Sequence, residues 1–268
     1  MMNRTRKPAV AGSFYPSDPG VLRTTVERLL ATAKKWQGAP PRALVAPHAG
    51  YVYSAPVAAS AYACLQPFPD RYRRVVLLGP AHRAPVRGIA LSHAGAFATP
   101  LGEVPLDRNT IEALDDPDVC FDDPAHAPEH SLEVQLPFLQ WVLDRFELVP
   151  LLVGAAPPDA VARVIERLRR PDTLIVVSSD LSHYLPYREA RTHDDGTCHA
   201  IETLAADELC SRDACGATPL KGLLRVAAQH GWSVHTLDLR NSGDTAGDHV
   251  QVVGYGAWAL TGAAGDSA

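Results

Sequence analysis

Three apolar segments that each end near a chemically reactive side chain constrain this chain more than any other feature. Residues 44–46 lead to His48, residues 74–78 lead to His82, and residues 173–178 lead to a polar stretch. Short apolar runs of this length, followed by turn-forming residues, are typical of strands buried on both faces of a sheet. Ligands of open α/β sheets bind at the carboxyl ends of the strands. We therefore expect the three strands to be adjacent, with their ends on the same side.

Strand and helix patterns alternate along the chain, which predicts an α/β fold. Helices are expected at about residues 17–36, 54–65, 107–114, 157–170, 197–209 and 220–230, with a further amphipathic helix through 139 and 142. Other strands are expected at 86–91, 98–106, 148–154, 234–239 and 250–260, with a hairpin loop at 241–248. Residues 6–16 should pack against the body, because they are too rich in Pro and Gly for a helix and too apolar for a disordered tail. We expect one domain over residues 1–268, with a central, largely parallel or mixed sheet flanked by helices and loose termini at 1–5 and 262–268.

Composition narrows the function classes. The chain is 46% hydrophobic without a long apolar segment, and its basic residues 1–7 do not precede an apolar signal core, so we expect a cytoplasmic protein that does not enter a membrane. A net charge of -5 without an internal basic block gives no electrostatic footprint for nucleic acid. The five cysteines form no C-x-x-C pair, which argues against a disulfide framework or a zinc ribbon. We expect them to be reduced and mostly buried.

His48 and His82 together favour a metal site. Either one alone would more often be a loop histidine with a local hydrogen bond, but two strands that each end on a histidine suggest one shared site. After the third strand, Asp180 and His183 favour function over a solvated turn, because loops positioned by rigid strands carry chemistry.

Two other polar stretches keep alternative interpretations open. His130 and Glu133 could cap the entry of a helix, where the dipole favours carboxylates, or line the site, and the residues give both interpretations equal weight. The loop at 241–248 is rich in turn-forming residues, yet its carboxylates could reach the site.

Seven motifs, in the right order and spread over nearly the whole chain, resemble the Memo-like family, whose microbial members are called AmmeMemoRadiSam system protein B. The motifs lie at residues 6–16, 46–51, 79–82, 99–102, 129–133, 178–184 and 241–244. The resemblance implies a fold similar to the class III extradiol ring-cleaving dioxygenases, which hold non-haem Fe(II). It also implies a functional link to a radical-SAM protein, but it does not by itself give a reaction.

The resemblance implies metal-ligand roles for His48 and His82, and it places Asp180 and His183 at the same pocket. For the third ligand it implies a cysteine in the loop before the final strand, as in the animal Memo proteins. No cysteine follows Cys215 in this chain, so we expect Asp244 in that loop to supply a carboxylate, with Asp180, Asp248 or solvent as the alternatives for the third position. Two histidines and one carboxylate form a triad suited to Fe(II), and the missing thiolate weakens the case for copper.

The preferred function is therefore an Fe²⁺-dependent, dioxygenase-like oxidoreductase acting on a small molecule or peptide. His183 would shuttle a proton as the catalytic base, with Asp180 and His130 as further catalytic residues, and Tyr51 and Glu133 would bind the substrate. A hydrolase using Zn²⁺-activated water, with His183 or Glu133 as general base, remains an alternative. A third interpretation is a non-catalytic module that retains the pocket for a peptide or protein partner.

Overall fold

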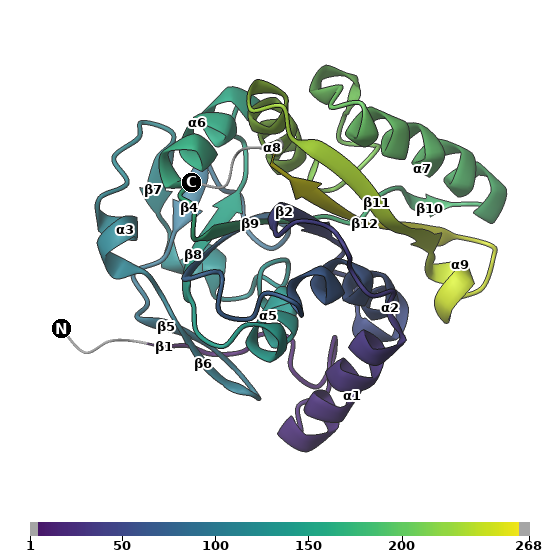
Figure 1. Cartoon of the computed structure of the whole chain (residues 1–268), viewed down its shortest axis with the longest axis horizontal. Helices are drawn as coiled ribbons and strands as arrows, with labels where there is room; N and C mark the ends of the chain where they lie inside the picture. The colour runs from purple at the N-terminus through teal and green to yellow at the C-terminus, as the bar shows by residue number, and fades with distance from the viewer. Residues whose placement is uncertain (1–4, 263–268) are drawn as a thin grey trace.

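A nine-stranded sheet forms the centre of the protein in this computed structural model, which describes residues 5–262 (Figure 1). Its strands run in the order β10-β12-β2-β9-β3-β8-β4-β7, and β11 pairs with β12. The strands are β2 (Pro41–Ala46), β3 (Arg74–Pro80), β4 (Ile89–Leu91), β7 (Val119–Phe121), β8 (Glu147–Val153), β9 (Thr173–Ser178), β10 (His183–Leu185), β11 (Ser233–Asn241) and β12 (Val252–Thr261). The expected mixed α/β fold with one central sheet is confirmed.

Helices cover both faces of this sheet. Figure 1 shows α1, α2 and α5 on one side and α6, α7 and α8 on the other. The helices are α1 (Pro19–Thr32), α2 (Tyr51–Tyr62), α3 (Arg108–Glu112), α4 (Asp123–His126), α5 (Leu136–Val142), α6 (Pro158–Leu168), α7 (Tyr187–Glu202), α8 (Ala217–Gln229) and α9 (Ser242–Thr245). Short 3-10 turns lie at η1 (Ala63–Leu65), η2 (Glu133–Gln135) and η3 (Ala206–Glu208). The start of α1 follows from its sequence, because the Asp18 side chain accepts a hydrogen bond from the Val21 N–H and Pro19 occupies the first turn.

The four strands β2, β9, β3 and β8 form a parallel core. Val45 pairs with Val177, and Val76 lies between Ile175 and Val149. These strands consist mainly of Val, Leu and Ile because helices bury both of their faces. Since β9 lies between β2 and β3 and runs parallel to both, the three expected strand ends are adjacent on one side of the sheet. This expectation is confirmed.

A small second sheet consists of β1 (Thr5–Arg6), β5 (Ala96–Thr99) and β6 (Gly102–Pro105). Thr5 pairs with Ala96, so this residue belongs to the fold rather than to a loose terminus. Residue 262, also expected to be loose, directly follows β12, and the remaining terminal residues, 1–4 and 263–268, lie outside the described residues.

Several boundaries differ from the expectations for local reasons. The α7 helix begins ten residues earlier than expected, at Tyr187 rather than at 197, and the mainly polar residues of its first turns gave no helical pattern in the sequence. The expected strand at 86–91 is shortened to β4 because Gly88 has a φ of +76°. The expected hairpin loop at 241–248 contains the short helix α9. The elements β7, α4 and β10 were not expected from the sequence.

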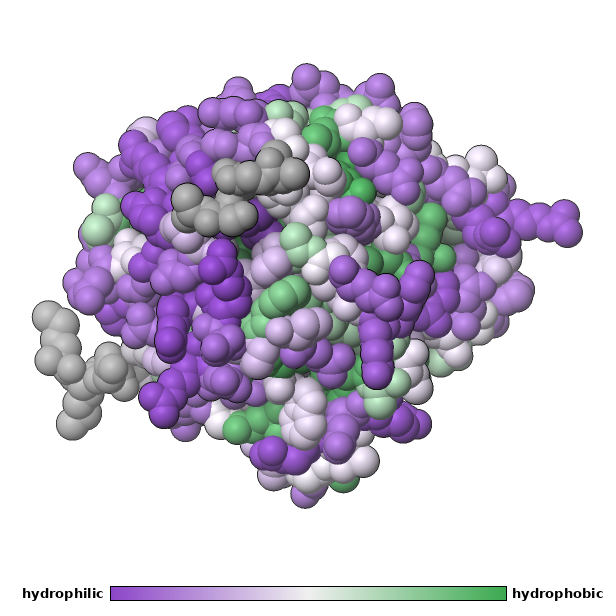
Figure 2. All heavy atoms as spheres, in the orientation of Figure 1, coloured by the Kyte–Doolittle hydropathy of each residue, from purple (hydrophilic) through white to green (hydrophobic). Residues whose placement is uncertain are grey.

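The cysteines are free, but only Cys64 and Cys198 are buried, while Cys120 and Cys210 are exposed and Cys215 is intermediate. Between residues 5 and 262 there is no helix with both the length and the apolar character needed to span a bilayer. Figure 2 shows a face that is largely hydrophilic, with small separate hydrophobic areas.

Candidate metal centre

Three histidines converge at the carboxyl ends of the parallel strands. His48 follows β2, His82 follows β3, and His130 lies in the loop between α4 and η2. One side-chain nitrogen of each lies within 4.8 Å of the others, and this is the single group of potential metal ligands found between residues 5 and 262. His48 and His130 are buried, whereas the His82 side chain is 28% exposed. The cluster is therefore open to solvent on the His82 side.

Hydrogen bonds fix the His48 ring in one tautomer. His48 Nδ1 lies 2.9 Å from Ser178 Oγ, which itself donates to the Ser131 carbonyl at 2.6 Å and accepts from Gln135 Nε2 at 2.8 Å. Because the single hydroxyl proton of Ser178 is already used, Nδ1 must carry the proton of the ring. Burial lowers the pKa of His48 to about 4, against a smaller opposing effect of Asp180. His48 is thus neutral at pH 7, with its Nε2 lone pair available to a metal.

Asp180 and Cys215 lie beside this Nε2 atom. Asp180 Oδ1 accepts a hydrogen bond from the backbone N–H of His48 at 2.7 Å, while Asp180 Oδ2 lies 3.9 Å from the ring nitrogen Nε2 of His48. Cys215, in the loop before α8, places its Sγ atom 3.3 Å from the same nitrogen. Burial, and then the charge of Asp180, raise the pKa of the Cys215 thiol to about 12, so the thiol is protonated at neutral pH unless a cation is present.

A buried carboxylate, Glu129, contacts the other two histidines. Its Oε1 atom lies 3.3 Å from His82 Nδ1 and 3.1 Å from His130 Nδ1. Its two oxygens also accept backbone N–H groups of His82, Arg83, His130 and Ser131. Burial alone would raise the pKa of Glu129, but the two imidazoles and the backbone amides that face its oxygens hold this pKa well below its usual range. Glu129 is therefore an anion that faces the cluster.

Comparison with known proteins places this site in a family. The profile described as Memo-like protein matches residues 6–259. The chain belongs to the Memo-like family. It is 38% identical to a MEMO1 family protein of Aquifex aeolicus, an alignment that covers 94% of this chain and 97% of the relative. A MEMO1 family protein of Sulfolobus acidocaldarius is 36% identical, with 93% and 97% covered. A crystal structure of the uncharacterized protein JW3007 from Escherichia coli K12 aligns with a TM-score of 0.48 and 14% identity, covering 80% of this chain and 98% of the other.

Cys215 is the residue of this Memo-like site that sequence reasoning missed. The resemblance implied a cysteine in the loop before the final strand, where this chain offers Asp244 instead, whereas the structure brings a thiol in from the loop before α8. The following Gly216 permits this approach, because a Cβ there would lie 2.6 Å from the Ser179 Cβ. Only glycine lets this loop approach the end of β9 so closely.

Asp244 is not in the cluster, which corrects the expectation that it points toward His48 and His82. It is the third residue of α9 and forms a capping box in which its Oδ2 accepts the Asn241 N–H at 3.0 Å. Its Oδ1 accepts the Tyr187 hydroxyl at 2.5 Å. Both carboxylate oxygens therefore serve the local fold, and His130 occupies the third position that the sequence assigned to Asp244.

Glu133 and Tyr51, expected to bind substrate, are used by the protein itself. Glu133 is fully buried and accepts the Ala9 and Val10 N–H groups, the Tyr15 hydroxyl at 2.5 Å and the Arg6 guanidinium. It thereby attaches the N-terminal segment to the body, as expected for residues 6–16. The Tyr51 hydroxyl donates to the Val134 carbonyl at 2.7 Å, and its ring is buried.

The expected base His183 lies on β10 with an exposed side chain, and its ring contacts Tyr184. Among the contacts described for residues 5–262, none joins His183 to the three clustered histidines. His130, by contrast, was expected to be catalytic and is a member of the cluster. The ring of Phe14, from the N-terminal segment, packs on His130 with 4.8 Å between centroids.

The donor set suits a transition metal. Imidazole nitrogens bind zinc, copper and iron, and a nearby thiol favours the softer of these ions. The buried Nδ1 of His130 has no hydrogen bond within the described residues, because its contact with Glu129 is badly aligned. An unsatisfied buried nitrogen costs about 1–3 kcal/mol, so this side of the site is incomplete without a further partner.

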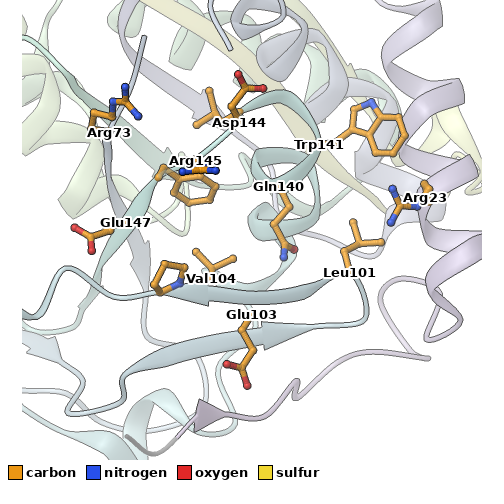
Figure 3. A pocket seen from close by; sticks show the side chains of 13 residues that line it. Arg23, Arg73, Leu101, Glu103, Val104, Gln140, Trp141, Asp144, Arg145 and Glu147 are labelled. Atoms are coloured by element: carbon orange, nitrogen blue, oxygen red, sulfur yellow. The ribbon is translucent and has the colours of Figure 1, made fainter. Parts of the chain in front are cut away.

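A separate pocket lies elsewhere on the molecule (Figure 3). It has a volume of about 570 Å³ and is formed by α1, β6, α5 and the start of β8, with Trp141 and Arg23 on one side and Arg73 and Glu147 on the other. It contains none of the three histidines. Its lining carries equal numbers of arginines and acidic residues, which gives no preference for ligand charge.

Proposed function

We propose that this Memo-like protein is a metal-dependent oxidoreductase of the dioxygenase type, with Fe²⁺ held by His48, His82 and His130. The observation that carries the proposal is the convergence of the three imidazoles at the carboxyl edge of the sheet, on the side where α/β proteins bind their ligands. The solvent-facing side at His82 leaves room for a substrate and for oxygen. The resemblance to extradiol dioxygenases supports iron over other metals.

The residues of this chain have separate tasks in the proposal. When bound, the iron would supply redox chemistry and polarise a chelating substrate. His48, His82 and His130 would hold the ion through one ring nitrogen each. Asp180 Oδ2, which has no hydrogen bond within the described residues, accepts the proton that a substrate hydroxyl releases. Asp180 thus takes the proton-accepting role that the sequence assigned to His183.

Cys215 restores a soft donor to the site. Its Sγ atom is close enough to His48 Nε2 for both groups to approach one ion. The argument against copper, which relied on the absence of a thiolate, therefore no longer holds. Copper remains a candidate beside iron, and their separation requires a direct measurement of metal preference.

A zinc hydrolase is the second candidate, favoured by one specific observation. Three histidines with an open position are a ligand set of catalytic zinc, and the free Asp180 oxygen is placed to accept a proton from water. The same site thus supports hydrolysis if the resident ion is Zn²⁺.

These candidates are distinguished by loading the metal-free protein under anaerobic conditions with Fe²⁺, Zn²⁺ or Cu⁺ and then assaying each form. The proposal expects oxygen uptake by the Fe²⁺ form with 4-nitrocatechol as a chelating probe, and a fall in kcat of about 100-fold in Asp180→Asn. The matched control, Asp244→Asn, should keep kcat because Asp244 lies outside the cluster. Ester hydrolysis by the Zn²⁺ form, with no oxygen uptake by the Fe²⁺ form, would favour the hydrolase. Absence of both activities in a metal-loaded protein would favour a binding module.

A further inference from the structure

The segment from Glu129 to Glu133 contacts the ends of β9 and β3 and the N-terminal segment. The Ser131 carbonyl accepts from Ser178 at the end of β9, and Ser131 Oγ donates to the Pro80 carbonyl at the end of β3. Glu133 holds the N-terminal segment. Glu129 faces in the other direction, toward the cluster. It lies outside every helix and strand, so secondary structure does not explain why this carboxylate is buried.

Glu129 accepts five hydrogen bonds with its two oxygens, and His130 Nδ1 is a sixth nitrogen close to them. Oε2 accepts the N–H groups of His82 at 2.6 Å and Arg83 at 3.2 Å, which lie in the loop after β3. Oε1 accepts the N–H groups of His130 at 2.8 Å and Ser131 at 3.0 Å, and both imidazole Nδ1 atoms approach it. One side chain thus connects two loops that are 47 residues apart in the sequence.

We infer that Glu129 is the positioning residue that makes His82 and His130 act as a preformed pair of metal ligands. The inference rests on the proposed function, in which these two histidines bind the ion. An ionised carboxylate can only accept hydrogen bonds, so the bonded Nδ1 of His82 carries the proton and its Nε2 lone pair faces away, toward the ion. The same carboxylate fixes the backbone at both histidines, so the rings stack 4.8 Å apart before any metal arrives. Among the hydrogen bonds of residues 5–262, none joins His48 to Glu129, and the His48 ring is held by Ser178.

Glu129→Gln tests this directly. The amide keeps the shape but replaces one acceptor oxygen by an NH₂ group, which then faces at least two N–H donors. One of the two loops must therefore detach from the side chain. We expect the affinity for Co²⁺, used as a spectroscopic probe, to fall by about 10- to 100-fold, as is usual when an orienting partner of a metal ligand is lost. Hydrogen exchange should quicken at the amides of His82 and Arg83, or at those of His130 and Ser131.

The matched control is Asp107→Asn. Asp107 is also a buried carboxylate with several donors, namely the Thr110 N–H and hydroxyl and the Arg74 guanidinium. Arg74 begins β3 and His82 follows its other end, so Asp107 lies at the far end of the strand from the cluster. Asp107→Asn should leave Co²⁺ affinity unchanged even if stability falls.

Unchanged Co²⁺ affinity in Glu129→Gln, with the four amides still protected, would overturn the inference. If that variant does not fold, nitrogen-15 NMR of the metal-free wild-type protein still decides, because the inference requires the Nδ1-protonated tautomer of His82 and an Nε2-protonated ring would refute it. A wild-type protein that binds no metal would end the proposed function instead, while the exchange and tautomer results would still report on Glu129.

Discussion

Glu133→Gln is the substitution that best separates a structural carboxylate from a functional one. Glu133 is fully buried, and its partner Arg6 is nearly so. The carboxylate also accepts two backbone N–H groups and the Tyr15 hydroxyl. The amide would leave the Arg6 charge uncompensated and would point an NH₂ group at existing donors. Removing one partner of a buried ion pair costs about 3–5 kcal/mol, and we expect a loss of unfolding free energy of that size.

Urea unfolding followed by circular dichroism measures this loss. The control is Glu112→Gln, since Glu112 forms an exposed pair with Arg108 one helical turn away and should contribute at most about 0.5 kcal/mol. The double variant Arg6→Met with Glu133→Gln should lose less than the sum of the single losses, because neither charge is then left unpaired. A loss below about 1 kcal/mol in Glu133→Gln, with the N-terminal segment still protected from exchange, would refute this reasoning.

Three further predictions test other parts of the account. Burial lowers the pKa of His126 to about 4. Between about pH 6.5 and 4 the folded protein therefore binds fewer protons than the unfolded chain. The free energy of unfolding should fall by up to about 3 kcal/mol as the pH drops through this window. His126→Asn should remove this part of the slope in urea titrations at several pH values, and an unchanged slope would exclude the assignment. Gly88→Ala should lower the thermal unfolding temperature more than Gly231→Ala. Both glycines have a positive φ, but only at Gly88 would a Cβ lie 2.2 Å from the Asp118 carbonyl. Equal losses in the two variants would contradict this prediction. Leu77→Ala, in the centre of β3, should cost about 2–5 kcal/mol of unfolding free energy, and a loss under 1 kcal/mol would show that the core there is less tightly packed than the structure indicates.

The sequence predicted the parallel strands and two of the clustered histidines because both depend on local pattern. His48 and His82 directly follow apolar runs, and parallel strand ends meet at one edge whatever the rest of the chain does. His130 was singled out, but its place in the cluster depends on Glu129 and Ser131, whose partners are distant in the chain.

The rest of the site could not be predicted from the sequence because it depends on contacts between residues that are far apart in the chain. Cys215 approaches His48 across 167 residues, and no local pattern marks such a contact. Asp244 could be read as a ligand or as a capping residue, and the capping box prevailed because Asn241 lies three positions before it. The start of α7 was missed because polar residues fill its first turns, although Ala190 and Asp194 are buried there.

Metal content of the protein purified without oxygen and without a histidine tag tests the central claim most directly. The account predicts about one transition-metal ion per chain in the wild-type protein and in Asp244→Ala, and loss of the ion in the variant His48→Ala with His82→Ala and in the variant His82→Ala with His130→Ala. Circular dichroism should show that both double variants remain folded, because the three side chains lie at strand ends and loops. Full metal content in the double variants, or loss of metal in Asp244→Ala with retention in His130→Ala, would contradict the three-histidine site.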